Sequence, residues 1–312
     1  MDFFYVFGKM AELFLIILIG YIACKCGFFG KEARLHVTKL VLNVAIPGIT
    51  LSSVLNQENL PGATELLGLF GVAFSSYLLL IAAAYLVPKL LRIKPEEEGI
   101  YRFMIAFANV GFIGYPVTQA IFGDRAVFYT SVFNLPFNVL AFSIGVAFIQ
   151  KSAAKENGSS GSGISWKSFL TPCLLSSLLA VVLAFFKVKA PAAIGNVCSM
   201  LGNITTPAAL MVIGSSLAEM SVKDMFGNAK VYLAALFRLV LIPCAFFLLY
   251  RSFVTDSLLL GECVILSAMP VATNGAMLCL QYHADEKLMA QGTFITTLAS
   301  MVTIPALAML FA

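Results

Sequence analysis

The chain has 312 residues, of which 60% are hydrophobic and only 12% charged, with a formal net charge of +4. Soluble domains carry about 25% charged residues, so this composition excludes an ordinary soluble protein and predicts an all-α polytopic membrane protein. The basic residues are scattered among short loops, which speaks against a nucleic-acid partner because such proteins cluster them on one face.

A membrane-spanning helix needs about 20 apolar residues. Ten stretches meet this need: 4–24, 37–55, 66–91, 101–122, 125–149, 168–187, 194–218, 230–250, 258–281 and 288–311. The one long connection, 151–166, contains Asn157-Gly-Ser-Ser-Gly-Ser-Gly163, which is typical of a flexible linker. We therefore expect a first five-span unit in residues 1–150 and a second in residues 167–312.

The two units repeat with an offset of 160 residues. Asn43-Val-Ala-Ile-Pro47 in the second span matches Asn203-Ile-Thr-Thr-Pro207 in the seventh. The same offset relates residues 109–116 to 269–276, which interrupt the fourth and ninth spans. Because each unit has an odd number of spans, the second enters the membrane from the opposite side, which predicts inverted repeats.

The fourth and ninth spans are expected to be broken helices that cross. Asn109-Val-Gly-Phe-Ile-Gly-Tyr-Pro116 and Met269-Pro-Val-Ala-Thr-Asn-Gly275 contain too many glycine, proline and asparagine residues for a regular helix. Lipid offers no partner to the backbone groups freed there, so such breaks survive only where they are buried in protein or line a cavity. A matched pair of broken spans indicates the binding site of a transporter.

The ends of the four half-helices carry partial charges. Two half-helix N-termini converge, each with about +0.5 charge and unpaired amides, so the crossing favours an anion and fits a carboxylate without any lysine or arginine. The opposite ends, near Ala108 and Ala268, offer carbonyl groups that could hold Na⁺.

Asn109 and Asn274 have amide groups that could contact a substrate or ion, or could simply cap the breaks. Asn43 and Asn203 could bond the carbonyl that the following proline frees, and either would also lie beside the site. The other candidate substrate-binding residues are Gly111, Tyr115, Pro116 and Thr273.

Ionisable residues within the spans have two interpretations each. Arg238 is expected to snorkel to the cytoplasmic interface, with attraction of an anionic substrate as the alternative. Glu262 is expected near the outer interface, with coupling to H⁺ or Na⁺ as the alternative.

Seven cysteines and two histidines show no metal-ligand spacing, so neither a metal nor another cofactor is expected.

The basic residues predict the orientation of the chain. Fourteen lie in loops after odd-numbered spans: Lys25, Lys31, Arg34, Lys39, Lys89, Arg92, Lys94, Arg102, Lys151, Lys155, Lys167, Lys223, Lys230 and Lys287. Five lie on the other side: Lys9, Arg125, Lys187, Lys189 and Arg251. The first side is expected to be cytoplasmic, so both termini would face outward from the cytoplasmic membrane.

Three motifs resemble the auxin efflux carrier family. They are the segment 109–116, the segment Ala268–Met277 followed by Gln281-Tyr282, and Phe294-Ile-Thr-Thr-Leu with Pro305. The resemblance covers essentially the whole chain and implies the ten-span inverted repeat shared with sodium–bile acid symporters, with a scaffold and a transport unit that move against each other. The large cytoplasmic loop of plant auxin carriers is absent here, so regulation through it is not implied.

These observations favour a secondary transporter that moves a small organic anion by alternating access, with Na⁺ or H⁺ coupling open. A receptor, a sensor or a channel built on a carrier fold is the alternative. An intramembrane enzyme is least supported, because no span supplies a catalytic dyad or metal cluster. The expected partners are the anion and the lipid bilayer, and a homodimer is compatible with the sequence.

Overall fold

The structure is a computed structural model that describes residues 3–56, 62–157, 172–188, 190–219, 221, 226 and 228–311. Within these residues the chain is helical, apart from turns and one isolated β-bridge. Six continuous helical segments are long and apolar enough to cross a membrane: Lys31–Leu55, Thr64–Leu90, Asp124–Ala154, Ala192–Ala218, Ala229–Tyr250 and Glu286–Phe311. Val110–Phe122 and Ser257–Ser267 are shorter apolar helices. The protein is therefore a polytopic, multi-pass membrane protein.

The helices of the first half, in chain order, are α1 Phe3–Lys25, α2 Lys31–Leu40, η1 Val41–Ala45, α3 Ile46–Leu55, α4 Ala63–Leu90, α5 Glu98–Ala106, η2 Val110–Gly114, α6 Tyr115–Phe122, α7 Asp124–Leu140, η3 Ala141–Gly145 and α8 Val146–Asn157. Those of the second half are α9 Pro172–Phe185, α10 Ala192–Gly202, α11 Thr205–Ala218, α13 Ala229–Leu236, η5 Phe237–Leu241, α14 Ile242–Tyr250, α15 Ser257–Ser267, α16 Asn274–Tyr282 and α17 Glu286–Ala308. Residues 151–157, predicted to begin a flexible linker, instead continue α8. Residues 158–166 lie outside the described part of the chain.

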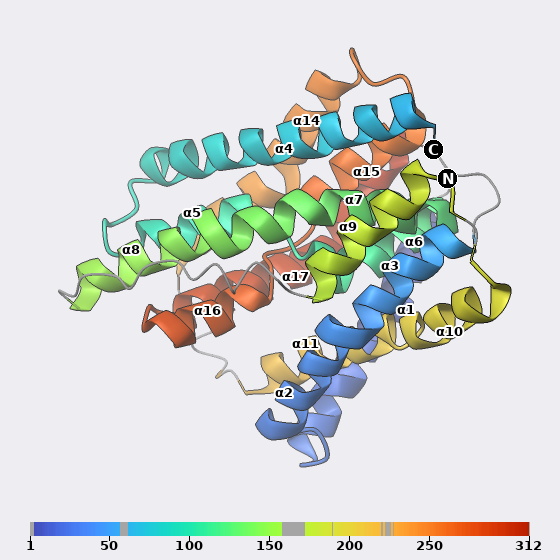
Figure 1. Ribbon diagram of the computed structural model, residues 1–312. Helices are drawn as coiled ribbons and strands as arrows, with labels where there is room; N and C mark the ends of the chain where they lie inside the picture. The colour runs from blue at the N-terminus through green and yellow to red at the C-terminus, as the bar shows by residue number, and fades with distance from the viewer. Residues whose placement is uncertain are drawn as a thin grey trace.

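The helices pack side by side in one bundle (Figure 1). Figure 1 shows α1, α2, α10 and α11 together at one side of the molecule and α4 and α14 at the opposite side. Helix α1 packs along α11, and α3 packs against both α9 and α10. A Cβ atom at Gly214 of α11 would lie only 1.9 Å from the backbone oxygen of Ile17 in α1. The absence of a side chain at this glycine therefore lets the two helix backbones approach closely, as small residues do between membrane helices.

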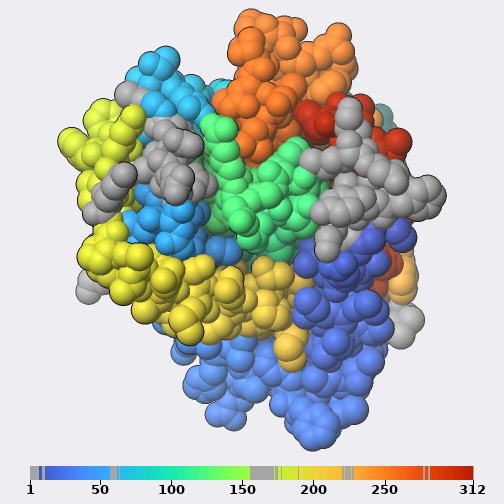
Figure 2. Space-filling model, turned by 90° about the vertical axis from the view of Figure 1, so that its right-hand side faces the viewer, coloured from blue at the N-terminus to red at the C-terminus, as the bar shows by residue number. Residues whose placement is uncertain are grey.

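The outer surface of the bundle is rich in exposed apolar side chains. Leu15 of α1 is 59% exposed, Leu67 of α4 is 70% exposed and Met200 of α10 is 72% exposed. Such surfaces are costly in water and suit contact with lipid tails. Figure 2 views the molecule from the right-hand side of Figure 1, where the α6–α7 segment fills the surface between α10–α11 and α14–α15.

Three segments of π-helix each end two residues before a proline. They are η1 before Pro47, η2 before Pro116 and η5 before Pro243. Proline has no backbone N–H, and a wider turn is one way to accommodate the carbonyl that it leaves without a partner. The prediction that Asn43 bonds this freed carbonyl is wrong, because its Nδ2 donates to the oxygen of Lys39 at 2.8 Å.

Candidate functional site

The two predicted breaks meet and pair with each other. The first lies between α5 and η2 and the second between α15 and α16. The N–H of Asn109 donates to the oxygen of Pro270 at 2.8 Å, and the N–H of Ala272 donates to the oxygen of Phe107 at 3.1 Å. These bonds flank the antiparallel bridge between Ala108 and Val271. The backbone groups freed by each break are thus satisfied largely by the other break, which removes the cost of leaving them unpaired in the membrane.

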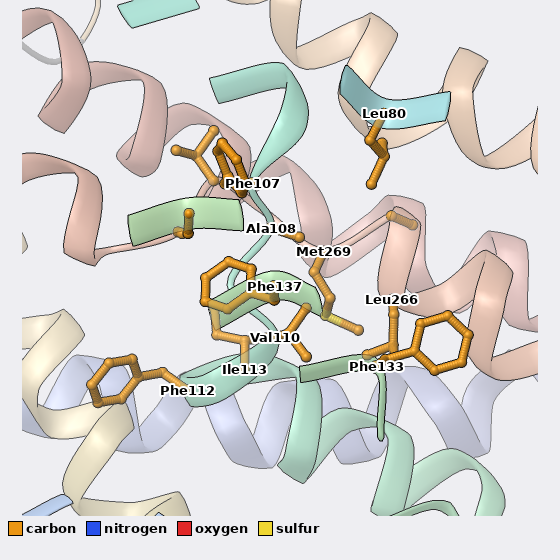
Figure 3. Close-up of a cluster of buried hydrophobic side chains, with 14 of the residues drawn as sticks. Leu80, Phe107, Ala108, Val110, Phe112, Ile113, Phe133, Phe137, Leu266 and Met269 are labelled. Carbon is orange, nitrogen blue, oxygen red and sulfur yellow. The ribbon is translucent and has the colours of Figure 1, made fainter. Parts of the chain in front are cut away.

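The paired segments are enclosed by apolar side chains rather than by lipid. Figure 3 shows Val110, Ile113, Phe137 and Met269 gathered around the non-helical segment. The rings of Phe107 and Phe137 meet edge to face with centroids 6.1 Å apart. The crossing therefore lies in the protein interior, where hydrogen bonds and helix dipoles act with little screening by water.

A cavity of about 300 Å³ lies against the crossing. It is lined by residues from the α2–α3 region, the two breaks, α7, η3 and α16: Lys39, Leu42, Asn43, Ile46, Asn109, Gly111, Phe112, Asn134, Phe137, Asn138, Phe142, Ala272, Thr273, Asn274 and Leu278. Five predicted site residues, namely Asn43, Asn109, Gly111, Thr273 and Asn274, therefore line one cavity. A volume of this size accommodates a small organic molecule.

Asn109 both caps a helix and offers a hydrogen-bond donor. Its side chain is 2% exposed, and its Oδ1 accepts from the N–H of Phe112 at 3.2 Å at the start of η2. Its buried Nδ2 has no partner among the described residues. Asn274, the first residue of α16, has a buried Oδ1 that likewise has none. Buried amide groups are costly when unpaired, so the two unpartnered atoms make this part of the cavity wall suited to polar contacts.

Tyr115, Pro116 and Asn203 do not line the cavity. Tyr115 is fully buried, and its hydroxyl lies 3.1 Å from the hydroxyl of Thr50. This contact joins the first residue of α6 to α3. Pro116 is also buried. Asn203 is exposed at the bend between α10 and α11, so the predicted resemblance between Asn43 and Asn203 does not extend to this cavity.

Three polar residues that line the cavity were not predicted: Lys39, Asn134 and Asn138. Asn134 and Asn138 lie one helical turn apart in α7 and flank Pro136. Two amides at this spacing on one face of an apolar span were a signal in the sequence. Lys39 adds a charged residue to the cavity wall, beyond the helix ends predicted from the sequence.

The prediction that Arg238 snorkels to the interface is wrong. Its side chain is 1% exposed. Its Nε donates to the oxygen of Met269 at 3.2 Å, and its Nη1 donates to the oxygen of Ile105 at 2.7 Å.

The oxygen of Ala108, a predicted Na⁺ ligand, accepts from the N–H of Val110 at 2.9 Å. Ala268, the other predicted ligand, directly follows the last residue of α15 as its C-cap and is fully buried.

Glu262 is also buried, so its predicted place at the interface is wrong. The side chain is 0% exposed, and Oε2 accepts from the hydroxyl of Thr130 at 3.1 Å. That hydroxyl lies 2.7 Å from the hydroxyl of Thr118 in α6, the second half of the first broken helix. Glu262 forms no ion pair within the described residues. The hydroxyls of Thr130 and Thr118 thus connect the carboxyl group of Glu262 to α6, a helix of the crossing.

A second cavity of about 330 Å³ adjoins the first and shares Phe112 and Thr273 with it. Its wall includes the ion pair between Arg34 and Glu219, with 2.6 Å between Nη2 and Oε2. Glu286 and Lys287 also line it. The polar wall is suited to a water-filled approach to the central cavity. No cluster of potential metal ligands occurs in the part of the chain that the structure describes.

The chain is similar over nearly its whole length to proteins named as membrane transporters. The membrane transport protein family model matches residues 5–308. An uncharacterized transporter of Methanocaldococcus jannaschii is 27% identical, with coverage of 93% of this chain and 94% of the relative. A Rhizobium meliloti protein that carries the provisional name of a malonate transporter is 23% identical, with coverage of 96% and 94%. The lysosomal cholesterol signaling protein of mouse is 23% identical over 94% of this chain and 36% of its own length.

Proposed function

Because the chain belongs to the membrane transport protein family, the family of the auxin efflux carriers, we propose that it is a secondary carrier for a small organic anion with a carboxylate group. Transport by alternating access would bring the central cavity to each side of the membrane in turn. The observation that carries the proposal is the cavity at the crossing, where two half-helices begin and where Asn109 and Asn274 have unpartnered amide atoms.

The electrostatics of the cavity favour an anion. Each half-helix N-terminus carries about +0.5 charge, so two that converge offset about one negative charge. The Nδ2 of Asn109 adds a hydrogen-bond donor. Together these groups would hold a carboxylate at the modest affinity that a carrier needs in order to release it.

The proposed architecture is two inverted repeats of five spans, 1–150 and 167–312. Two sets of helix contacts support it. Helix α1 of the first span packs on α11 of the seventh, and α9 of the sixth packs on α3 of the second. Likewise α1 packs on α17 of the tenth span, and α9 packs on α7 of the fifth. Within each set, replacing every span by its counterpart in the other repeat converts the first contact into the second. A pseudo-twofold axis requires this correspondence.

We further propose that both termini face outward. The excess of basic residues on one side supports this orientation. The ion pair Arg34–Glu219 joins the start of α2 to the residue after α11, and Arg125–Glu65 joins the starts of α7 and α4. Each pair joins helix ends that this topology puts on the same side of the membrane. In a cysteine-free background, an impermeant reagent is expected to label a cysteine at position 2 and not one at position 160, both outside the described residues. Labelling of position 160 alone would reverse the orientation.

Lys39 supports a substrate with a second anionic group. It lies at the exposed edge of the cavity, whereas Asn109 lies at its buried end. A dicarboxylate could place one group at the crossing and the other near Lys39, and the name of the Rhizobium relative agrees with such a substrate. Lys39→Gln is expected to weaken binding of dicarboxylates about fivefold, the value of an exposed ion pair, and to leave monocarboxylates unchanged. Competition for uptake measures both, and an equal loss for both classes would contradict this role of Lys39.

Flux into proteoliposomes tests the proposed function. A panel of labelled monocarboxylates and dicarboxylates is offered with imposed Na⁺ or pH gradients or with neither. At least one carboxylate should enter saturably, and its neutral amide should compete poorly. Lack of saturable flux of every anion in the panel, from protein that is monodisperse and correctly inserted, would contradict the proposal.

A sensor that binds the same ligand is the second candidate. The mouse relative has a signalling name, and this chain matches only 36% of its length. A carrier fold can therefore form part of a signalling protein. Saturable binding to the purified protein without flux or counterflow would favour this alternative.

A further inference from the structure

The helix ends on the two sides of the crossing carry partial charges of opposite sign. On the cavity side, η2 and α16 begin, so their N-termini face the proposed anion. On the other side, α5 ends at Ala106 and α15 ends at Ser267. A helix C-terminus has unpaired carbonyl groups and about −0.5 charge, so these two ends together carry about one negative charge inside the membrane.

Arg238 lies against these two C-terminal ends. It bonds the oxygen of Ile105 in the last turn of α5 and the oxygen of Met269 just after α15. One guanidinium thus bonds a carbonyl from each broken helix, and its unit charge equals the combined partial charge of the two ends. Within the described residues no acidic side chain forms an ion pair with Arg238. The two carbonyl groups therefore offset part of the cost of burying its charge, and its buried Nη2 has no partner among these residues.

Arg238 belongs to the eighth span, which is the third helix to meet at this point, after the two broken helices. Arg238 is on η5, a segment of π-helix between α13 and α14. Such segments often occur at functional sites because they redirect a side chain. Arg238 lines a small space together with Met104, Gly292 and Thr296, and this space has no volume for a water molecule. The guanidinium is therefore held dry between the two broken helices.

We propose that Arg238 is a built-in cation that locks the first halves of the two broken helices into one unit, in the place where a soluble cation could otherwise bind the same carbonyls. Arg238 is then a positioning residue: it sets the crossing that the substrate amides require without touching the substrate. A consequence is that the carrier needs no Na⁺ at this position. The flux consequences rest on the proposed transport function, whereas the stability consequences do not.

Chemical rescue tests this role. Arg238→Ala removes the guanidinium and leaves a space of its size, so flux should fall at least about tenfold, because two buried carbonyls lose their partners. Low concentrations of guanidinium ion should restore flux saturably and should raise the melting temperature of this variant. Arg238→Met fills most of the space without a charge, so guanidinium should rescue neither its flux nor its melting temperature. Arg251→Ala is the matched control, because Arg251 is exposed at the far end of the same span, and guanidinium should not affect it.

Several outcomes would overturn the proposal. They are near wild-type flux of Arg238→Met or equal responses of the alanine and methionine variants to guanidinium. If Arg238→Ala cannot be purified, Arg238→Lys replaces it, and its partial flux is expected to exceed that of Arg238→Met. If wild-type protein moves no anion, the transport function fails, but the melting temperatures with and without guanidinium still decide the role of Arg238.

Discussion

Replacing Asn109 with alanine is expected to reduce anion transport about 10- to 100-fold, the value of one hydrogen bond to a charged group. The expectation follows from the unpartnered Nδ2 of this buried side chain beside the cavity. Asn274→Ala should have a smaller effect on the anion, because the unpartnered atom of Asn274 is Oδ1, an acceptor that can bond only a donor group on the substrate. Initial rates of uptake at several substrate concentrations give the change in kcat/KM.

The two functions of Asn109 can be separated. Alanine also removes the cap on the N–H of Phe112, which costs about 1 kcal/mol. Asn109→Asp keeps an oxygen for this cap, but it removes the donor and adds a charge of the same sign as the substrate. It should therefore keep the melting temperature near the wild-type value and lose transport more completely than alanine does.

Asn203→Ala is the matched control, since Asn203 is exposed outside the cavity. Its uptake should be near the wild-type rate. Normal uptake by both Asn109→Ala and Asn274→Ala would show that neither amide binds the substrate.

Replacing Glu262 with glutamine is expected to abolish the response of transport to a pH gradient. Our hypothesis is that Glu262 couples proton movement to transport. It rests on its complete burial without an ion pair in the described residues and on its link through Thr130 to Thr118 of α6. A carboxyl that is buried in one conformation and hydrated in another can take up and release a proton in each cycle. Glutamine keeps the size and an oxygen for Thr130 but cannot exchange the proton.

Counterflow and gradient-driven uptake distinguish coupling from a general loss of function. Glu262→Gln should exchange substrate near the wild-type rate when no gradient is imposed, and a pH gradient of either direction should no longer change its uptake. Glu96→Gln is the control, because Glu96 is exposed in a loop. Stimulation of Glu262→Gln equal to that of wild type would contradict proton coupling through this residue.

The helices and their breaks can be predicted from sequence because their signals are local. Apolar length marks a span, and glycine and proline interrupt it wherever the chain folds. In the part of the chain that the structure describes, helices overlap every predicted range, although α2 begins at Lys31 instead of residue 37 and α8 ends at Asn157 instead of residue 149. Asn109 and Asn274 could be chosen from the sequence for the same reason, since each lies within a break that lipid cannot satisfy.

Which polar groups meet is decided by the packing of helices that are distant in sequence. Arg238 and Glu262 looked interfacial when counted along single spans, yet three-helix contacts bury both. Lys39 and Asn138 reach the cavity only because α2 and α7 pack beside the crossing. Hydropathy locates a span, and counting residues from its end gives the depth of a residue in the membrane. Whether a side chain is buried and paired depends instead on the neighbouring helices. The built-in cation and the full cavity wall could therefore be found only in the tertiary structure.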